Sequence, residues 1–382
     1  MPRAVIVEAV RSPVGRRGGT LSHVRPDDLA AHVLGALVRR AGIDPALVED
    51  VIMGCVTPIG EQGLNIARVA VMIAGFPLEV CGVQINRMCG SSQQAIHFAA
   101  QAIEAGDMEV VIGGGIESMS RVPMGSDGGP FSDKLMARFA LVPQGISAEM
   151  VADHWRISRR EMEEFALESH RRAIRAIDEG RFRSQIVPVE VTLPDGTRVT
   201  MENDEGPRRD TSLEKMAALA PAFKPDGKIT AAVSSQISDG AAAVLLMSED
   251  KARELGLKPR ARFLSRVVAG VDPVMMLHGV IPATRKALAR AGLRIEDIDV
   301  VEINEAFASV VLAWKKEIQP PDMERVNPNG GACALGHPLG ATGAILMTKL
   351  LYELERTGGR YGLQTMCIGH GMATASVIER LG

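Results

Sequence analysis

The sequence predicts an α/β protein made of two related halves, and two observations lead to that prediction. Segments with the pattern of buried strands alternate with segments of helical pattern along most of the 382 residues. Residues 28–56 read as a helix, a turn and a buried strand, and residues 282–308 repeat this order, with a shared Arg-Ala-Gly at the helix end. Several matching elements in the same order favour a duplication over chance.

A long insertion interrupts the first half. The stretch VVIGGGIES (110–118) has a later counterpart in MCIGHGMATA (366–375), which runs directly into ATASVIER. The first half reaches its own equivalent of that ending, DGAAAVLLMSE (239–249), only after a segment that carries SDGGPF, the charged helix SRREMEEFALESHRRAIRAIDEG and the turns LPDG and KPDG. We therefore expect a first half, an inserted segment and a second half, with these bounds: 1–118 with 232–256, 119–231, and 257–382.

The composition excludes several classes of protein. The formal net charge is −3 and 46% of the residues are hydrophobic, so nothing indicates a nucleic-acid partner or an anionic membrane surface. No stretch approaches the roughly 18 apolar residues of a membrane span, and the first residues, MPRAVIVEAVRSP, read as a strand rather than a signal peptide. The cysteines are odd in number and form no CxxC pair, which predicts neither disulfides nor a zinc site and favours a reducing cytoplasm. They are Cys55, Cys81, Cys89, Cys333 and Cys367.

Cys89 stands just before a predicted helix, in the stretch RMCGSSQQAI. A free cysteine usually fills space as a small apolar residue. A thiol at a helix N-terminus, however, feels unsatisfied N–H groups and the positive end of the dipole, which lower its pKa and make it a nucleophile. Cys89 alone leaves both interpretations open.

The second half offers partners for Cys89. The Gly-rich loop NPNGGACALGHPLGATGA leads into a helix, and its His337 takes the helix-start position that corresponds to Cys89. A neutral imidazole can take a thiol proton near neutral pH. Asn304 follows the buried strand DVVEI, where its amide could orient a water or a histidine, although such an Asn is more often a turn former. Cys367 precedes IGHG and would by itself be a buried strand residue, while the Gly369 N–H could point into a cleft.

These motifs together resemble the thiolase family. INRMCGSSQQAI, NEAFA, GGACALGHPLGATGA and MCIGHG carry the resemblance, and GGIESMSRVPM, DEGPRRDTSLEKMAALAPAF and ITAAVSSQISDGAAAVLLMSE extend it over nearly the whole chain. The resemblance implies a five-layered α-β-α-β-α fold of two duplicated halves, with an inserted loop domain that holds coenzyme A. It also implies a homodimer or homotetramer that pairs through a central strand.

The resemblance further implies an acyltransferase that interconverts a 3-oxoacyl-CoA plus CoA with a shortened acyl-CoA plus acetyl-CoA. Cys89 would hold the acyl group as a thioester, His337 would activate it, and Cys367 would serve as acid and base. One oxyanion pocket would combine His337 with a water held by Asn304, and the other would combine the backbone N–H groups of Cys89 and Gly369. Coenzyme A enters as a substrate, and neither a metal nor a redox cofactor is expected.

Three positions match the coenzyme A contacts of the family. Arg208 suits the nucleotide end, while Phe223 and Ser235 suit the thin pantetheine arm. The run DEGPRRD around Arg208 could equally be a solvated loop.

Three other positions depart from the family pattern and leave the acyl specificity open. His370 stands where many relatives have glycine, and it either fills space or tunes Cys367. Val233 replaces a common asparagine, and Gln144 stands where Met-Gly is frequent; both lie in segments that line the acyl and pantetheine tunnel. We expect a degradative enzyme, with a biosynthetic acetoacetyl-CoA thiolase as the alternative.

Other classes fit the residues less well. A ketosynthase-like condensing enzyme would place a histidine at Asn304 and lack Cys367. A non-catalytic acyl-CoA binder would have lost at least one catalytic position, and a cysteine hydrolase would need a water-activating base besides His337.

Overall fold

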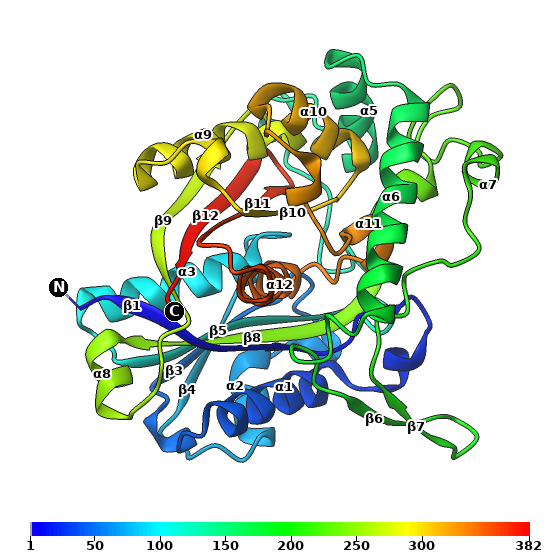
Figure 1. The fold of residues 1–382 in the computed structure, drawn as a ribbon. Helices are drawn as coiled ribbons and strands as arrows, with labels where there is room; N and C mark the ends of the chain where they lie inside the picture. Colours follow the sequence, from blue (N-terminus) through cyan, green and yellow to red (C-terminus); the bar gives the residue numbers. More distant parts are fainter. Residues whose placement is uncertain (1) are drawn as a thin grey trace.

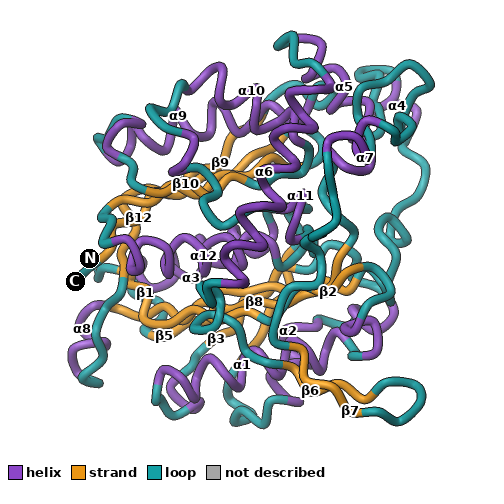
Figure 2. The backbone as a smooth tube through the Cα atoms, turned by 45° about the vertical axis from the view of Figure 1, so that its right-hand side comes forward, coloured by secondary structure: helices purple, strands orange, loops and turns teal. Residues whose placement is uncertain are grey.

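Five layers of helices and strands make up the molecule, a computed structural model that describes residues 2–382. Two layers of strands enclose a central pair of helices, and a further pair of helices covers each outer face (Figures 1 and 2). This arrangement confirms the predicted α-β-α-β-α architecture. The helix pairs, from the first half to the second, are α1 (Pro26–Ala41) with α2 (Ile66–Ile73), α3 (Ser91–Ala105) with α12 (Thr342–Thr357), and α9 (Val280–Ala291) with α10 (Ala308–Ile318).

Each strand layer belongs to one half. The first contains, in spatial order, β4 (Cys81–Ile85), β3 (Asp50–Gly54), β5 (Val110–Ser118), β8 (Ser238–Ser248) and β1 (Ala4–Arg11), with the short β2 (Gly15–Arg16) beside β8. The second contains β9 (Ala261–Gly270), β12 (Met372–Arg380), β11 (Tyr361–Ile368) and β10 (Val300–Ile303). The two layers are joined at one corner, where Val5 and Ile6 of β1 pair with Arg262 and Ala261 of β9.

Strand directions confirm the duplication predicted from the sequence. In the first half β3 pairs parallel with β5, and β5 pairs antiparallel with β8. In the second half β10 pairs parallel with β11, and β11 pairs antiparallel with β12. The repeated Arg-Ala-Gly has a structural reason, because Gly42 after α1 and Gly292 after α9 both end their helices with a left-handed φ of 68°.

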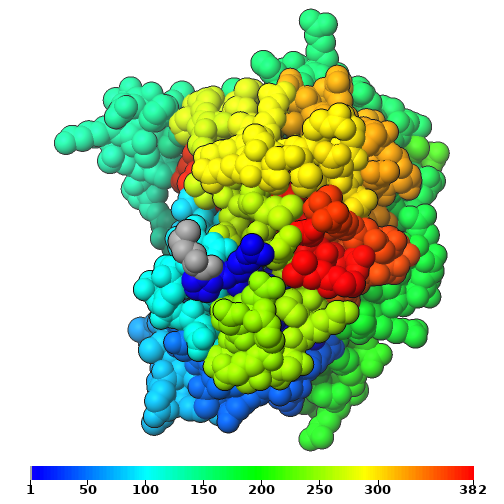
Figure 3. Space-filling view, turned by 60° about the vertical axis from the view of Figure 1, so that its left-hand side comes forward, coloured from blue at the N-terminus to red at the C-terminus, as the bar shows by residue number. Residues whose placement is uncertain are grey.

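The inserted segment leaves the first half after β5 and returns at β8, its direct neighbour in the sheet. Its charged helix, α6, begins with a capping box made by Ser158 and Glu161 and lies beside the second half (Figure 1). The early part of this segment projects from the body of the molecule (teal in Figure 3). Its elements are α4 (Asp133–Met136), α5 (Gln144–His154), α6 (Arg159–Asp178), β6 (Val189–Thr192), β7 (Arg198–Met201) and α7 (Leu213–Ala217).

Two short helices complete the fold. Helix α8 (Glu249–Glu254) connects the halves, and α11 (Ala332–Leu335) lies in the Gly-rich loop before α12. Within residues 2–382, no helix is both long enough and apolar enough to cross a membrane.

Candidate active site

Cys89 lies in a tight turn between β4 and α3, one residue before the capping Gly90. The turn places Met88 in the left-handed region at a φ of 46° and is held by Ser91, whose hydroxyl donates to the Met88 carbonyl at 2.6 Å and accepts from the Arg87 N–H at 2.9 Å. A side chain at Gly90 would collide with Ile368 of β11. The sequence therefore places the thiol at a helix start and directly against the second half.

The electrostatics of Cys89 differ from the expectation for a helix start. Burial raises the pKa of the Cys89 thiol to about 11, although hydrogen bonding from the N–H groups of Gly369 and of Cys89 itself lowers it. The prediction of a lowered pKa is therefore wrong for the free protein, because the loss of water outweighs the local N–H groups. The resting residue is a neutral thiol that needs a base.

His337 is held as that base. Its ring Nδ1 lies 2.6 Å from the Thr342 hydroxyl, which donates its own proton to the Pro338 carbonyl at 2.7 Å. The hydroxyl oxygen must therefore accept from an Nδ1–H, which makes Nε2 the nitrogen that accepts a proton. Burial lowers the pKa of His337 to about 4, so the ring is neutral. The helix itself begins at Thr342, so His337 precedes the helix start by a short loop rather than occupying it.

Asn304 directly follows β10, as expected, and faces the imidazole. Its Nδ2 lies 3.3 Å from His337 Nε2. Its Oδ1 is buried and has no hydrogen-bond partner within residues 2–382. Because a buried amide oxygen normally has a donor, this atom is suited to hold a water or a substrate group beside His337.

Cys367 and Gly369 come from the end of β11 and the turn that follows it. Burial raises the pKa of the Cys367 thiol well above its ordinary value, and the nearby Cys89 adds to this. In the turn, His370 has a φ of 60° and Gly371 a φ of 76°. A side chain at Gly369 would crowd the Gln144 amide and the Met88 sulfur, both at 2.9 Å. Because Gly369 has no side chain, its backbone can lie close enough to Cys89 for its N–H to bond the sulfur.

One cavity of about 1390 Å³ brings these predicted residues together. Three of the four candidate catalytic side chains line it, and so do the three predicted coenzyme A contacts and two of the departures from the family pattern. Asn304, Gly369 and Val233 are not among its lining residues; Asn304 reaches the cavity through His337, and Val233 is fully buried. The lining residues from the predictions are Cys89, His337, Cys367, Arg208, Phe223, Ser235, Gln144 and His370.

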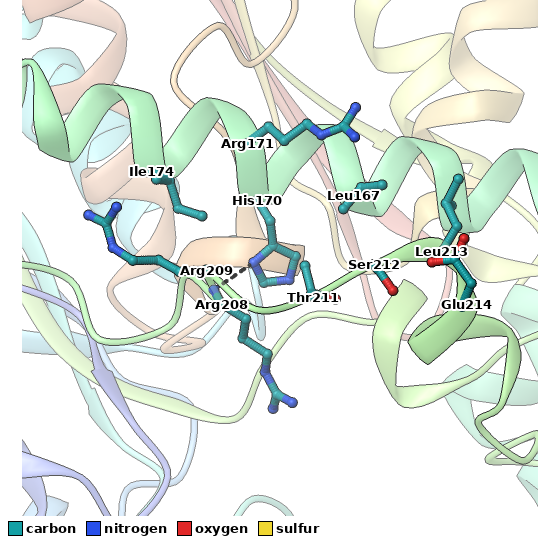
Figure 4. Close-up of a pocket in the computed structure, with 10 residues that line it drawn as sticks. All are labelled: Leu167, His170, Arg171, Ile174, Arg208, Arg209, Thr211, Ser212, Leu213 and Glu214. Carbon is teal, nitrogen blue, oxygen red and sulfur yellow. Dashed lines mark hydrogen bonds between the residues drawn. The ribbon is translucent and has the colours of Figure 1, made fainter.

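Arg208 also lines a second, smaller cavity of about 270 Å³ between α6 and residues 208–214. Its backbone N–H donates to Nδ1 of His170 on α6 at 3.0 Å, while its side chain extends away from that helix (Figure 4). Burial and the Arg208 charge lower the pKa of His170 to about 4, so this ring stays a neutral acceptor. His170 therefore anchors the loop that carries Arg208. It was missed from the sequence, where it reads only as one residue on the buried face of an amphipathic helix.

Within residues 2–382, no cluster of three or more His, Cys, Asp or Glu side chains is placed to hold a metal ion.

Comparisons with known proteins cover the whole chain. The family model "Thiolase, N-terminal domain" matches residues 4–250, and "Thiolase, C-terminal domain" matches residues 257–380. The steroid 3-ketoacyl-CoA thiolase FadA6 of Mycobacterium tuberculosis is 52% identical, over 100% of this chain and 95% of its own length. A 3-ketoacyl-CoA thiolase of Vibrio vulnificus is 48% identical over 100% of both chains. The crystal structure of the Bacillus anthracis acetyl-CoA acetyltransferase superposes with a TM-score of 0.93 at 42% identity, covering 100% of this chain and 99% of that one.

Proposed function

This chain belongs to the thiolase family, and on that premise we propose how its residues cleave a 3-oxoacyl-CoA. The enzyme is an acyltransferase that interconverts a 3-oxoacyl-CoA plus CoA with an acyl-CoA plus acetyl-CoA, and its relatives named 3-ketoacyl-CoA thiolase support the degradative direction. The observation that carries the proposed roles is the single cavity lined by Cys89, His337 and Cys367 from both halves.

The first half-reaction begins at Cys89. His337 Nε2 takes the thiol proton as the sulfur attacks the 3-keto carbon of the substrate. Because both groups are neutral at rest, with the Cys89 pKa at about 11 and the His337 pKa at about 4, proton transfer accompanies attack instead of preceding it. The backbone N–H groups of Cys89 and Gly369 stabilise the oxyanion that forms on the attacked carbon.

Cleavage of the bond between carbons 2 and 3 then leaves the acyl group on Cys89. The electron pair moves onto the departing acetyl-CoA as an enolate, whose oxygen is stabilised by His337 and by a water on Asn304 Oδ1. The Cys367 thiol gives its proton to carbon 2, which releases acetyl-CoA.

The second half-reaction returns the enzyme to its starting state. The Cys367 thiolate takes the proton from an incoming CoA thiol, and the CoA sulfur attacks the thioester carbonyl on Cys89. The shortened acyl-CoA leaves, and Cys89 recovers its proton from His337. Each proton that a residue takes up in one step is given back in another, so the cycle needs no further proton donor or acceptor.

The inserted segment, residues 119–231, is proposed to hold coenzyme A. Phe223 lies edge-to-face against Phe307 with ring centres 5.9 Å apart, and a side chain at Gly145 would collide with the Phe223 ring. The Ser235 N–H donates to the Ala306 carbonyl at 2.9 Å, which ties this wall to the segment after Asn304. A narrow slot beside two aromatic rings fits the pantetheine arm, and Arg208 fits the phosphates.

One assay tests the proposed activity and, with a panel of substrates, identifies the preferred acyl group. Loss of the absorbance of the 3-oxoacyl-CoA–Mg²⁺ enolate should require free CoA; loss without CoA would instead indicate hydrolysis. A substrate panel from four carbons up to ring-bearing acyl groups should show a preference beyond four carbons. The naming of FadA6 as a steroid thiolase makes the ring-bearing compounds the informative members.

A homodimer or dimer of dimers is proposed on the basis of β4. This strand ends the first layer, and its side chains are exposed or half-buried. Large apolar side chains are exposed on it and close to it in sequence, including Leu78 (78% exposed) and Val83 (40% exposed). An apolar edge strand is suited to pair with a second copy. Light scattering should show a dimer or tetramer at micromolar concentration, and a stable monomer would contradict the proposal.

A cytoplasmic location is also proposed. All five cysteines are free, which suits a reducing compartment.

A further inference from the structure

Glu117 is a fully buried carboxylate that the reaction steps above do not use. It lies next to the end of β5, and its two oxygens accept four N–H groups. Oε2 accepts from the backbone of Val56 at 2.8 Å and of Gly340 at 2.9 Å. Oε1 accepts from the Thr57 backbone at 3.1 Å and from Gln62 Nε2 at 2.8 Å.

These contacts indicate that Glu117 is ionised. Burial raises the pKa of Glu117, while the hydrogen bonds oppose that change. A neutral carboxyl would have to place its proton on an acceptor, but all four partners are N–H donors. The Cys55 thiol, 4.0 Å from Oε1, is also placed as a donor. The arrangement therefore fits the anion, and a negative charge lies buried behind the active site.

The four contacts join segments from both halves. Val56 and Thr57 follow β3 in the first half, whereas Gly340 lies in the short loop between His337 and α12. That loop packs directly on the first half, because a side chain at Gly340 would lie 2.8 Å from both Glu117 Oε2 and the Cys55 Cα. A side chain at Gly115 on β5 would likewise collide with the Gly340 carbonyl. Glu117 thus fastens the loop that carries His337 to the half that carries Cys89.

We propose that Glu117 is a positioning residue that fixes His337 relative to Cys89 across the two halves. Its charge also disfavours a free Cys89 thiolate, so the thiol keeps its proton until His337 takes it during the attack. This proposal rests on the roles proposed above for Cys89 and His337.

Burial opposes the ionisation of Cys89 most strongly and the charge of Glu117 on β5 adds to this, whereas the N–H groups of Gly369 and of Cys89 itself favour it. Cys367 on β11 and His337 are also titratable and line the same cavity. Among these groups only Glu117 carries a full charge at rest, so removal of that charge should lower the pKa of Cys89.

Glu117→Gln tests both parts of the proposal. Without the charge, alkylation of Cys89 by iodoacetamide, followed by peptide mass spectrometry, should shift its midpoint to lower pH and become faster at a fixed pH. Thiolysis should change in the opposite direction, with kcat falling by about 100-fold because His337 is misplaced, and with little change in the KM for CoA. A loosened fold would also hydrate Cys89 and make it more reactive, because burial is the main cause of its raised pKa. The effect of the charge is therefore judged by comparison with Glu117→Asp, which disturbs the same packing but keeps the charge.

Matched variants separate charge, length and simple burial. Glu117→Asp keeps the charge but shortens the reach to Gly340, so the alkylation midpoint should stay near that of the wild type while kcat remains low. Glu149→Gln is the control. Glu149 is buried and accepts backbone N–H groups of Lys228 and Ile229 at 2.9 and 2.8 Å, but it contacts neither site loop. It should lower the melting temperature without moving the alkylation midpoint.

Gly340→Ala provides an independent test should Glu117→Gln not fold. It leaves the Glu117 charge in place but pushes the His337 loop outward, so kcat should fall with no shift in alkylation. A folded Glu117→Gln protein with wild-type alkylation and kcat, or a Gly340→Ala protein with wild-type kcat, would overturn the proposal. Absence of thiolysis in the wild-type enzyme would instead contradict the proposed function, and the alkylation profiles would still report on the Glu117 charge.

Discussion

The two halves share one strand arrangement but contribute opposite chemistry. In each half a strand and a helix, β3 and α2 in the first and β10 and α10 in the second, precede the segment that leads into a central helix, α3 or α12. The turn of the first half carries the thiol of Cys89, and the corresponding loop of the second carries the imidazole of His337. A duplicated fold thus placed two equivalent loops face to face, and their difference in side chains created a site that neither half has alone.

The halves also differ in what surrounds these loops. In the first half β4 adds a fifth strand at the edge, whereas the second half has only an isolated bridge between Val301 and Val326 next to β10. After β5 the chain departs into the inserted segment, whereas after β11 it turns at once through Gly369 and His370. The first half therefore carries the segment proposed to hold coenzyme A, and the second carries the tight turn whose N–H faces Cys89.

Removal of the first-half thiol should have the largest effect. Cys89→Ala should form no covalent adduct with acetyl-CoA and should lose thiolysis by several orders of magnitude, because Cys89 is the proposed acyl carrier and Cys367 is proposed to move protons only. Intact-mass spectrometry and the enolate assay measure the two effects. Cys81→Ala, at the exposed cysteine that begins the edge strand β4, is the matched control and should keep wild-type activity. An acetyl adduct on the Cys89→Ala protein would point to another nucleophile.

Removal of the second-half thiol should separate the two half-reactions. Cys367→Ala should still accept an acetyl group on Cys89, although slowly, because the leaving CoA is less well protonated. It should not exchange the α-protons of acetyl-CoA with D₂O, since Cys367 is the proposed proton carrier at that carbon. NMR of acetyl-CoA in D₂O measures the exchange. Exchange at the wild-type rate would transfer the acid and base role to His337 or His370.

Local sequence was sufficient to predict much of this comparison. Residue type and turn context made Cys89, His337 and Asn304 candidates, to which the thiolase motifs gave roles, and the shared Arg-Ala-Gly marked two helix ends whose glycines adopt the same φ. Each of these features depends on a few consecutive residues, so it can be recognised in the sequence alone.

Features that depend on distant segments were not predictable in the same way. The pKa of Cys89 is raised by burial, and part of that burial comes from Ile368 in the other half. Thr342, which fixes the tautomer of His337, and Glu117, which holds its loop, reveal their roles only through contacts that the fold creates. A single buried glutamate or threonine has no local pattern that distinguishes such a role.

Acid should weaken the enzyme through its buried neutral histidines. The pKa of His97 is lowered from 6.5 to about 3, and those of His170 and His337 are lowered to about 4, mainly by burial. Between pH 6.5 and 4 the unfolded chain binds protons on these rings that the folded chain does not. Stability should therefore be complete above pH 6.5 and fall as the pH drops through this window. Urea unfolding at a series of pH values measures the slope.

The variant His97→Gln should reduce that slope, because it removes one of these buried imidazoles, whose ring lies 2.7 Å from the Ser376 hydroxyl and outside the active-site cavity. The acid limb of kcat/KM should also lie well below the ordinary histidine pKa, since His337 must be neutral to accept the Cys89 proton. A limb near pH 6.5 would show that the imidazole is more hydrated than the structure indicates.

His370 should have the smallest effect, although it stands in the most distinctive turn of the second half. Its φ of 60° suits glycine, and its exposed ring lies 5.5 Å from the Phe131 ring, edge-to-face, in the lining of the cavity. His370→Gly relieves a left-handed conformation that costs about 1 kcal/mol, but it also frees the unfolded chain by a similar amount, so the stability should hardly change.

The Gly369 N–H is a backbone group and stays in place in the His370→Gly protein. Thiolysis should persist within several-fold of the wild-type rate, with an altered ratio of kcat/KM between short and ring-bearing 3-oxoacyl-CoA substrates, and Phe131→Ala should alter that ratio similarly. Complete loss of thiolysis in a folded His370→Gly protein would instead assign the imidazole a part in proton transfer with Cys367.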